Sequence, residues 1–150
     1  MDILDAKIYT TSHDYALDIF NVMDDNNLNE SYNQLFQHLE QGLTEIIPRK
    51  FESKEIALRK TRQAEHHDIQ TVINSKIIND TQFELEIITD SRPGLLNMIS
   101  GEINQLSLEI DKARINTLGN RAEDFFLITS KKVEETTIKK LKKNILERLT

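Results

Sequence analysis

The stretch FELEIITDSRPGLLNMISGEINQL, residues Phe83 to Leu106, changes its hydrophobic period in the middle. Up to Asp90, apolar side chains alternate with acidic and polar ones, which is the pattern of a half-buried strand. Beyond the Arg-Pro-Gly turn, apolar residues recur every three or four positions, which predicts a helix from about Pro93 to Leu106. The stretch is therefore interpreted as a strand, a tight turn and an amphipathic helix.

The residues after this helix complete most of a split βαβ unit. Alternation returns from Leu108 to Thr117, breaks at Gly119-Asn120 and resumes from Phe125 to Thr129, which predicts a hairpin because glycine supplies the positive φ of a tight turn. Helical spacing from Ile138 to Leu149 predicts a last helix. The order β-α-β-β-α is that of a ferredoxin-like α+β fold, with an antiparallel sheet and helices on one face.

The first half of the chain repeats the later part of this plan. Strand patterns cover Asp2 to Thr11 and Tyr15 to Met23, and a helical pattern covers Tyr32 to Ile46. The stretch ILDAKIYTT in the first half matches EIDKARINT in the second when the two are offset by one residue, so that Ala6 falls over Ala113, and ALDIF matches AEDFF. The period of about 106 residues is typical of tandem domains.

The repeat predicts that the first module is incomplete. In the alignment Met1 lies over Leu108, so the first repeat begins at its second strand and lacks its opening strand and helix. We expect either that the chain is part of a longer polypeptide or that another copy supplies the missing half. Bare strand edges tend to recruit other chains, which favours self-association through sheet edges as an alternative role.

The chain is expected to contain two modules, of which the first is truncated. Residues 1–77 are a truncated module with a linker at 48–68, and residues 78–150 are a second module. The stretch Ile69 to Ile73 is predicted to be the closing strand of the first module. The boundary is predicted near residues 77–81.

Composition and charge exclude several classes of protein. The chain has 150 residues, no cysteine and a formal net charge of -6. The absence of cysteine excludes disulfides, thiol catalysis and Cys-ligated zinc, and the acidic balance argues against general nucleic-acid binding. No run reaches the roughly 18 apolar residues of a membrane helix and no signal-peptide pattern is present, so we expect no membrane partner and a cytoplasmic location. The lysine-rich run over 131–143 is expected to be a solvated helix face.

The turn before the first long helix has the chemistry of an anion site. The first N-H groups of a helix lack intrahelical partners and carry partial positive charge, so they can hold a carboxylate or a phosphate. Gly94, which has no Cβ, lets a ligand approach the N-H groups of Gly94, Leu95 and Leu96. Pro93 suits a first helical turn and Ser91 is the expected N-cap. The alternative is an ordinary strand-to-helix packing turn with no ligand.

Three stretches carry a resemblance to a known family. LEIITDSRPGLLNMISGEI and KARINTLGNRAEDFFLIT resemble the C-terminal ACT domain of bacterial protein-PII uridylyltransferases, the bifunctional uridylyltransferase and uridylyl-removing enzymes. DAKIYTTSHDYALDIFNVMD, with the helix after it, resembles the preceding ACT domain of the same family. The resemblance covers nearly the whole chain and implies a pair of ACT modules, the first truncated.

The resemblance implies nitrogen sensing by a segment with no catalytic residue, metal or cofactor of its own. In this family the ACT domains respond to glutamine and control the modification of the PII protein by catalytic domains, which use Mg²⁺ and lie outside this chain. The amino-acid-binding turn would comprise Asp90, Ser91, Arg92, Pro93, Gly94, Leu95 and Leu96. One position departs from the family pattern, which has an acid directly before Arg-Pro-Gly: here Ser91 stands there and the acid is Asp90.

Other candidate sites are disfavoured by their surroundings. His66-His67-Asp68 resembles part of the metal signature of HD phosphohydrolases, but a metal site needs three or four converging ligands and no ladder of His and Asp accompanies it. The paired acids Asp24-Asp25 and Glu123-Asp124 are interpreted as parts of a hairpin end and a strand. No phosphate-binding loop or nucleophile elbow is present.

Overall fold

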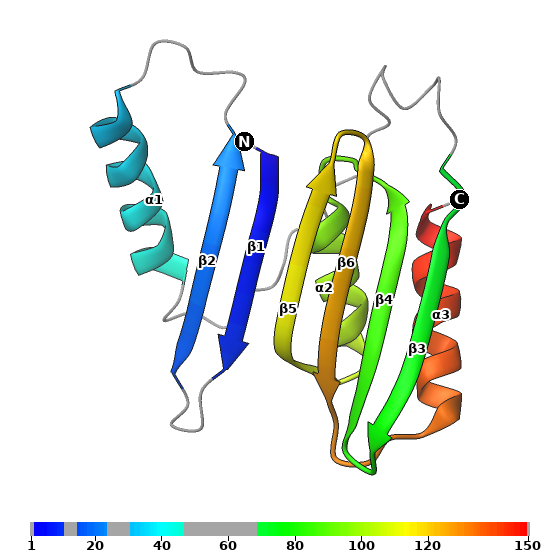
Figure 1. Cartoon of the computed structure of the whole chain (residues 1–150). Coiled ribbons are helices and arrows are strands. Elements are labelled where there is room, and N and C mark those ends of the chain that lie inside the picture. The colour runs from blue at the N-terminus through cyan, green and yellow to red at the C-terminus, as the bar shows by residue number, and fades with distance from the viewer. Residues whose placement is uncertain (1, 11–14, 24–30, 47–68, 150) are drawn as a thin grey trace.

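The computed structural model describes residues 2–10, 15–23, 31–46 and 69–149 (Figure 1). In these ranges the chain forms strands and helices in the order that the hydrophobic periods predict. The elements are β1 (Asp2–Thr10), β2 (Ala16–Met23), α1 (Tyr32–Ile46), β3 (Val72–Asn79), β4 (Gln82–Asp90), α2 (Leu95–Gln105), β5 (Glu109–Leu118), β6 (Arg121–Thr129) and α3 (Glu135–Leu149).

All six strands belong to one antiparallel sheet in the order β2-β1-β5-β6-β4-β3. Helices α2 and α3 lie behind β5, β6, β4 and β3 in Figure 1 and contact each other, whereas α1 lies on the outer side of β2. The prediction of an α+β fold built on an antiparallel sheet with helices on one face is confirmed. The arrangement is consistent with paired βαββ modules of the ACT type.

The strand predicted at Ile69 to Ile73 was wrong in its bounds. The strand is β3, which begins at Val72 and forms a hairpin with β4, so that it lies at the sheet edge farthest from β2. The predicted boundary at 77–81 falls in this hairpin, whose turn is closed by a 2.9 Å bond from the Thr81 N-H to Asn79 Oδ1. β3 therefore extends the sheet of the second half of the chain.

The core lies between the helices and the inner face of β4, β5 and β6. Alternate β4 and β6 residues are buried there, as the period-2 pattern predicts. The inner stripes of α2 and α3 pack against them. The fully or almost fully buried apolar residues include Phe83, Leu85, Ile87, Ile99, Ile103, Phe126, Ile128, Leu141 and Ile145.

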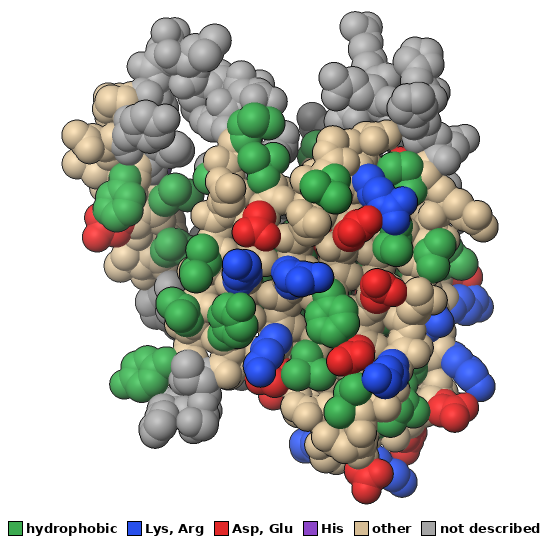
Figure 2. Space-filling model, viewed as in Figure 1, with side chains coloured by type: hydrophobic (Ala, Val, Ile, Leu, Met, Phe, Trp, Pro, Cys, Tyr) green, Lys and Arg blue, Asp and Glu red, His purple; other side chains and the backbone are tan. Residues whose placement is uncertain are grey.

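The two halves of the sheet meet at β1 and β5. Ala6 pairs with Ile115 and Lys7 pairs with Arg114 across this joint. Because the sequence repeat aligns Lys7 with Arg114, the two equivalent strands run antiparallel about a local two-fold axis at that pair. Both side chains are exposed, and Figure 2 shows Lys and Arg side chains in the middle of the sheet face that is turned to the viewer.

The first half is much less buried than the second. Every residue of β2 is exposed, whereas alternate residues of its counterpart β6 are buried. Phe20 of β2 is 47% exposed, and Phe126, its counterpart in the repeat, is 0% exposed. The elements that bury β6, namely β4 at its edge and α2 beneath the sheet, therefore have no counterpart over β2 in the described residues.

Two predictions fall partly or wholly outside the described residues. His66-His67-Asp68 and the linker at 48–68 lie outside them. Among the residues that the structure describes, no cluster of three or more His, Asp or Glu side chains could hold a metal ion. In the same residues no helix has both the length and the apolar character needed to cross a membrane.

Candidate functional site

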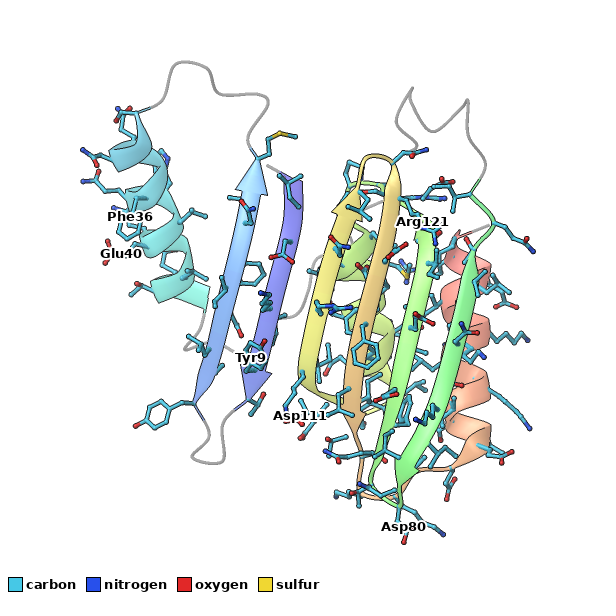
Figure 3. All side chains as sticks on the ribbon, in the orientation of Figure 1. Tyr9, Phe36, Glu40, Asp80, Asp111 and Arg121 are labelled. Carbon is cyan, nitrogen blue, oxygen red and sulfur yellow. The ribbon has the colours of Figure 1, made fainter. Side chains whose placement is uncertain are left out.

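The turn between β4 and α2 is held against the β5–β6 hairpin. The Ser91 N-H donates a 2.7 Å hydrogen bond to the Asn120 carbonyl, which lies in the hairpin turn. Asp90 pairs with Arg121 in the β4–β6 ladder, and Figure 3 shows Arg121 at the start of β6. The candidate site therefore lies where the end of β4, the start of α2 and the β5–β6 turn meet.

Gly94 sets the start of the helix. Its φ of 86° and ψ of -2° place it in the left-handed region, where a residue with a Cβ is strained by roughly 1–2 kcal/mol. The predicted start at Pro93 and the predicted N-cap at Ser91 were wrong: the helix begins at Leu95, and Gly94 is an N-cap with no side-chain hydrogen bond. The left-handed glycine separates Pro93 from the helix, and the Ser91 amide is used by Asn120.

The helix start offers fewer amide donors than the sequence predicts. The Leu95 N-H already donates a 3.1 Å bond to the Arg92 carbonyl, which closes the turn. The Gly94 carbonyl accepts a 2.9 Å bond from the Met98 N-H, as a first intrahelical bond should. The side chain of Leu95 is buried in the core and that of Leu96 is partly buried. The amides of Gly94 and Leu96 are the remaining candidates of the three predicted donors.

Arg92 is an interior residue of this turn. Its side chain is 9% exposed, its Nη1 donates a 3.2 Å bond to the Leu149 carbonyl at the end of α3, and its Nη2 lies 3.8 Å from Asp90 Oδ2. The positive charge is favourable at the end of α3, where the helix dipole is negative. Nε of Arg92 is buried without a hydrogen-bond partner. Arg92 therefore joins the turn to α3 and adds positive charge next to the helix start.

The carboxylate of Asp90 also interacts with other groups of the protein. Its Oδ1 accepts a 3.4 Å bond from the Ile69 N-H, and its other oxygen faces Arg92. Beside it, the hydroxyls of Thr89 and Thr71 are 2.8 Å apart. The structure brings Asp90 and Arg92 together, while Pro93 is exposed and Ser91 is half-buried at the turn.

Two acids are buried in the core, of which Glu102 was not singled out from the sequence and Asp124 was correctly interpreted as part of a strand. Glu102 on α2 is buried and accepts hydrogen bonds of 3.0 Å from Asn144 Nδ2 and from Arg148 Nη1 of α3. Asp124 lies on the inner face of β6, where burial raises its pKa to about 7 and a bond from the backbone of Asn116 lowers it in part. Both occupy inward positions of a periodic pattern, which is the signal that could have marked them.

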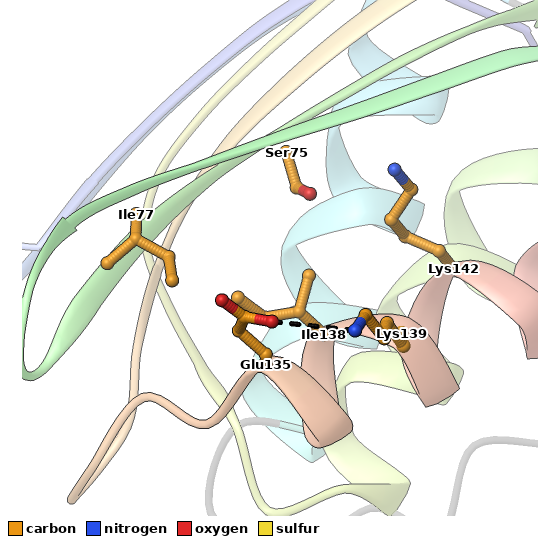
Figure 4. A pocket seen from close by; sticks show the side chains of 6 residues that line it. All are labelled: Ser75, Ile77, Glu135, Ile138, Lys139 and Lys142. Carbon is orange, nitrogen blue, oxygen red and sulfur yellow. Dashed lines mark hydrogen bonds and ion pairs between the residues drawn. The ribbon is translucent and has the colours of Figure 1, made fainter.

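A hollow of about 280 Å³ lies between β3 and α3, at the opposite end of the sheet from the turn (Figure 4). It lies near the tip of the β3–β4 hairpin, which Asp80 marks in Figure 3. Glu135 and Lys139 at its mouth form an ion pair of 3.4 Å one helical turn apart. The prediction of a solvated lysine face agrees with the exposure of Lys139, while Lys142 is partly buried in the wall of the hollow.

Comparison with known proteins shows which enzymes this chain is related to. The chain is 36% identical over 146 residues to the bifunctional uridylyltransferase/uridylyl-removing enzyme of Psychrobacter arcticus, covering 95% of the chain and 16% of that enzyme. It is 35% identical over 130 residues to the enzyme of the same name from Nitrosospira multiformis, covering 85% and 15%. The chain is homologous to a segment of these enzymes.

A third relative extends the match along the chain. The bifunctional uridylyltransferase/uridylyl-removing enzyme of Aromatoleum aromaticum is 32% identical over 152 aligned positions, which cover 98% of the chain and 17% of the enzyme. The chain thus spans about one sixth of the length of the relatives it matches. No family model and no solved structure matched it.

Proposed function

We propose that this chain is a glutamine-sensing regulatory segment of a protein-PII uridylyltransferase and uridylyl-removing enzyme, built from ACT modules. Homology to those enzymes over 95% of the chain supports the class of parent protein. The single observation that carries the sensing role is the β4–α2 turn, where a left-handed glycine opens an 11-residue helix beside a buried arginine. Nucleotidyl transfer and uridylyl removal, with the Mg²⁺ expected for them, are assigned to other parts of such an enzyme.

The turn would hold the α-carboxylate of the amino acid. On this proposal the amides of Gly94 and Leu96 donate to the carboxylate, and the partial positive charge of the helix start favours it. Arg92 adds positive charge and fixes the turn through its bond to Leu149. Asp90 shapes the site from within but does not bind the ammonium group, since its oxygens face Arg92 and Ile69.

Binding of glutamine at the turn would affect two neighbouring elements. The Ser91–Asn120 bond connects the turn to the β5–β6 hairpin, and the Arg92–Leu149 bond connects it to the end of α3. β5 in turn forms the joint with β1. Glutamine can bias the catalytic domains, and through them the PII protein, only as far as it binds one arrangement of these elements more tightly than another.

Calorimetry on the full chain tests the sensing role. We expect heat of binding with glutamine and at least about tenfold weaker binding of alanine and glutamate, which corresponds to about 1.4 kcal/mol. Gly94→Ala strains the turn and narrows the approach to the amides, so binding should be lost or weakened at least tenfold.

Gly101→Ala is the matched control for this variant. Gly101 lies in the same helix, and a Cβ there meets nothing within 4 Å, so this variant should bind like the wild type. The proposal is refuted if glutamine, alanine and glutamate bind with equal affinity, or if Gly94→Ala and Gly101→Ala bind glutamine with equal affinity.

An association module without a small-molecule ligand is the second candidate. The observation that favours it is the exposure of all eight residues of β2. Light scattering with and without glutamine separates the candidates, because a sensor that changes its assembly responds to glutamine and a purely structural module does not.

A further inference from the structure

The sheet face opposite α2 and α3 has its charges in an ordered pattern. On β5, β6 and β4 the residues that alternate with the buried ones lie on this outer face. In two rows across these strands, a base on β5 lies next to an apolar residue on β6, which lies next to an acid on β4. The rows are Arg114, Phe125 and Glu86, followed by Lys112, Leu127 and Glu84.

The basic side of this pattern is not neutralised within the sheet. At the joint Lys7 lies directly opposite Arg114, and like charges in opposite positions of a sheet are unfavourable. Among the residues that the structure describes, Lys7, Lys112 and Arg114 form no ion pair. On the acidic side Lys76 lies opposite Glu84 but forms no ion pair with it. Acidic groups placed over β5 would therefore reduce the repulsion at the joint.

An apolar stripe separates the two kinds of charge. Phe125 and Leu127 lie on the outer face of β6 and are half-buried between their charged neighbours. In Figure 2 basic side chains lie over β1 and β5, acidic ones lie on the side of β4, and hydrophobic ones lie between them. Sheets that pack face to face, about 10 Å apart, bury such apolar side chains between them.

The pattern is complementary to itself. A two-fold axis that runs along β6, between two stacked sheets, places β5 of each copy over β4 of the other. Arg114 then lies over Glu86 of the second copy, Lys112 lies over Glu84 of the second copy, and the apolar stripe meets itself. Because every contact of a two-fold interface occurs twice, pairs of opposite charge form on both sides of the stripe.

The position of the pattern in the sheet matters for the choice of occupant. β5, β6 and β4 are interior strands, so the rows do not depend on what lies beyond either edge of the sheet. The formal net charge of -6 disfavours a nucleic acid over the basic side. An occupant with acids over β5 and bases over β4 is required, and a second copy has both in the matching rows.

We propose that two copies of this chain associate face to face through the outer surface of β5, β6 and β4, about a two-fold axis along β6. The contact pairs the bases of β5 with the acids of β4 in the other copy and covers Phe125 and Leu127. It does not involve glutamine, so it stands or falls separately from the sensing role.

Light scattering across a concentration series tests the contact. We expect a mass of twice 17.4 kDa that falls to 17.4 kDa on dilution. Arg114→Glu and Glu86→Lys each place like charges in contact and should raise the dimer Kd by about tenfold or more. Both substitutions in one chain should restore the dimer, and so should an equal mixture of the two single variants, because opposite charges then meet again.

Glu147→Lys is the matched control for the change in net charge. Glu147 lies on α3 and its side chain is 64% exposed, so this variant should remain dimeric. Raising the salt concentration from about 0.05 M to about 0.5 M should weaken the wild-type dimer, because exposed charge pairs are screened. A chain that is monomeric at every concentration overturns the proposal, as do larger assemblies, a dimer that both reversals leave intact, and single variants that stay monomeric when mixed.

Discussion

Replacing Asp124 by Asn should make the protein less sensitive to pH. Asp124 is buried on the inner face of β6, its Oδ1 has no hydrogen-bond partner, and burial raises its pKa from 3.8 to about 7. Between these values the folded protein keeps the proton and the unfolded chain has released it. The free energy of unfolding contributed by this group is therefore highest below pH 3.8 and falls as pH rises to about 7.

The size of the effect follows from the pKa. A shift from 3.8 to about 7 corresponds to roughly 4 kcal/mol in total, since one pKa unit is about 1.4 kcal/mol. About two of these roughly three pH units lie above pH 5, so between pH 5 and pH 8 the wild type should lose roughly 3 kcal/mol relative to Asp124→Asn. Asparagine can still accept the Asn116 bond but has no proton to release.

Urea unfolding at pH 5 and pH 8 measures this difference. The other titrating groups contribute equally to the pH dependence of the free energy of unfolding in the two proteins, so their contributions cancel. Asp18→Asn is the matched control: Asp18 occupies the equivalent position in the repeat but is exposed, so this variant should follow the wild type. The change in the free energy of unfolding between pH 5 and pH 8 is compared for the wild type and Asp124→Asn. If the two changes differ by less than about 1 kcal/mol, burial of Asp124 does not make the stability of the protein depend on pH.

The packing of the two helices gives further expectations. Glu102→Ala removes the acceptor for Arg148 and should lower the free energy of unfolding by about 1–3 kcal/mol in denaturant titrations, and a change within 0.5 kcal/mol would show that this contact is not stabilising. Ile145→Ala leaves a cavity at a fully buried position and should lower the free energy of unfolding by about 2–5 kcal/mol. Leu146→Ala, at the exposed position beside it, should lower it by less than about 1 kcal/mol. Equal losses in the two variants would contradict the burial pattern of α3.

Periodicity predicted the elements with clear amphipathic patterns. β4, α2 and β6 have one buried face each, so their spacing alone reveals them. β3 was misplaced because its sequence, VINSKIIN, mixes polar and apolar residues on an edge where most side chains are exposed. A half-exposed strand leaves a weak pattern in its sequence, and the turn that joins β3 to β4 falls where a module boundary was predicted, near residues 77–81.

The turn between the strand and the helix was predicted in its location and less well in its details. The Arg-Pro-Gly sequence between a strand pattern and a helical pattern predicts the turn, but the left-handed conformation of Gly94 moved the helix start to Leu95. Burial of Arg92 depends on the carbonyl of Leu149, which is 57 residues away along the chain. Contacts of this range become visible only in the folded structure.

The local two-fold axis at the joint was implicit in the repeat. The alignment that places Ala6 over Ala113 makes β1 and β5 equivalent, but it does not say that equivalent strands pair with each other. The pairing became visible with the sheet order. The same repeat identifies the buried positions of β6 against which the exposure of β2 is judged.

Titration of the ¹⁵N-labelled full chain with glutamine, followed by amide proton–nitrogen correlation spectra, tests the central claim most directly. We expect the amide signals of Gly94 and Leu96 to shift and saturate with glutamine but not with alanine, while the signal of Gly101 stays in place. Saturable shifts confined to other residues, or a turn whose signals do not move at any glutamine concentration, would contradict it.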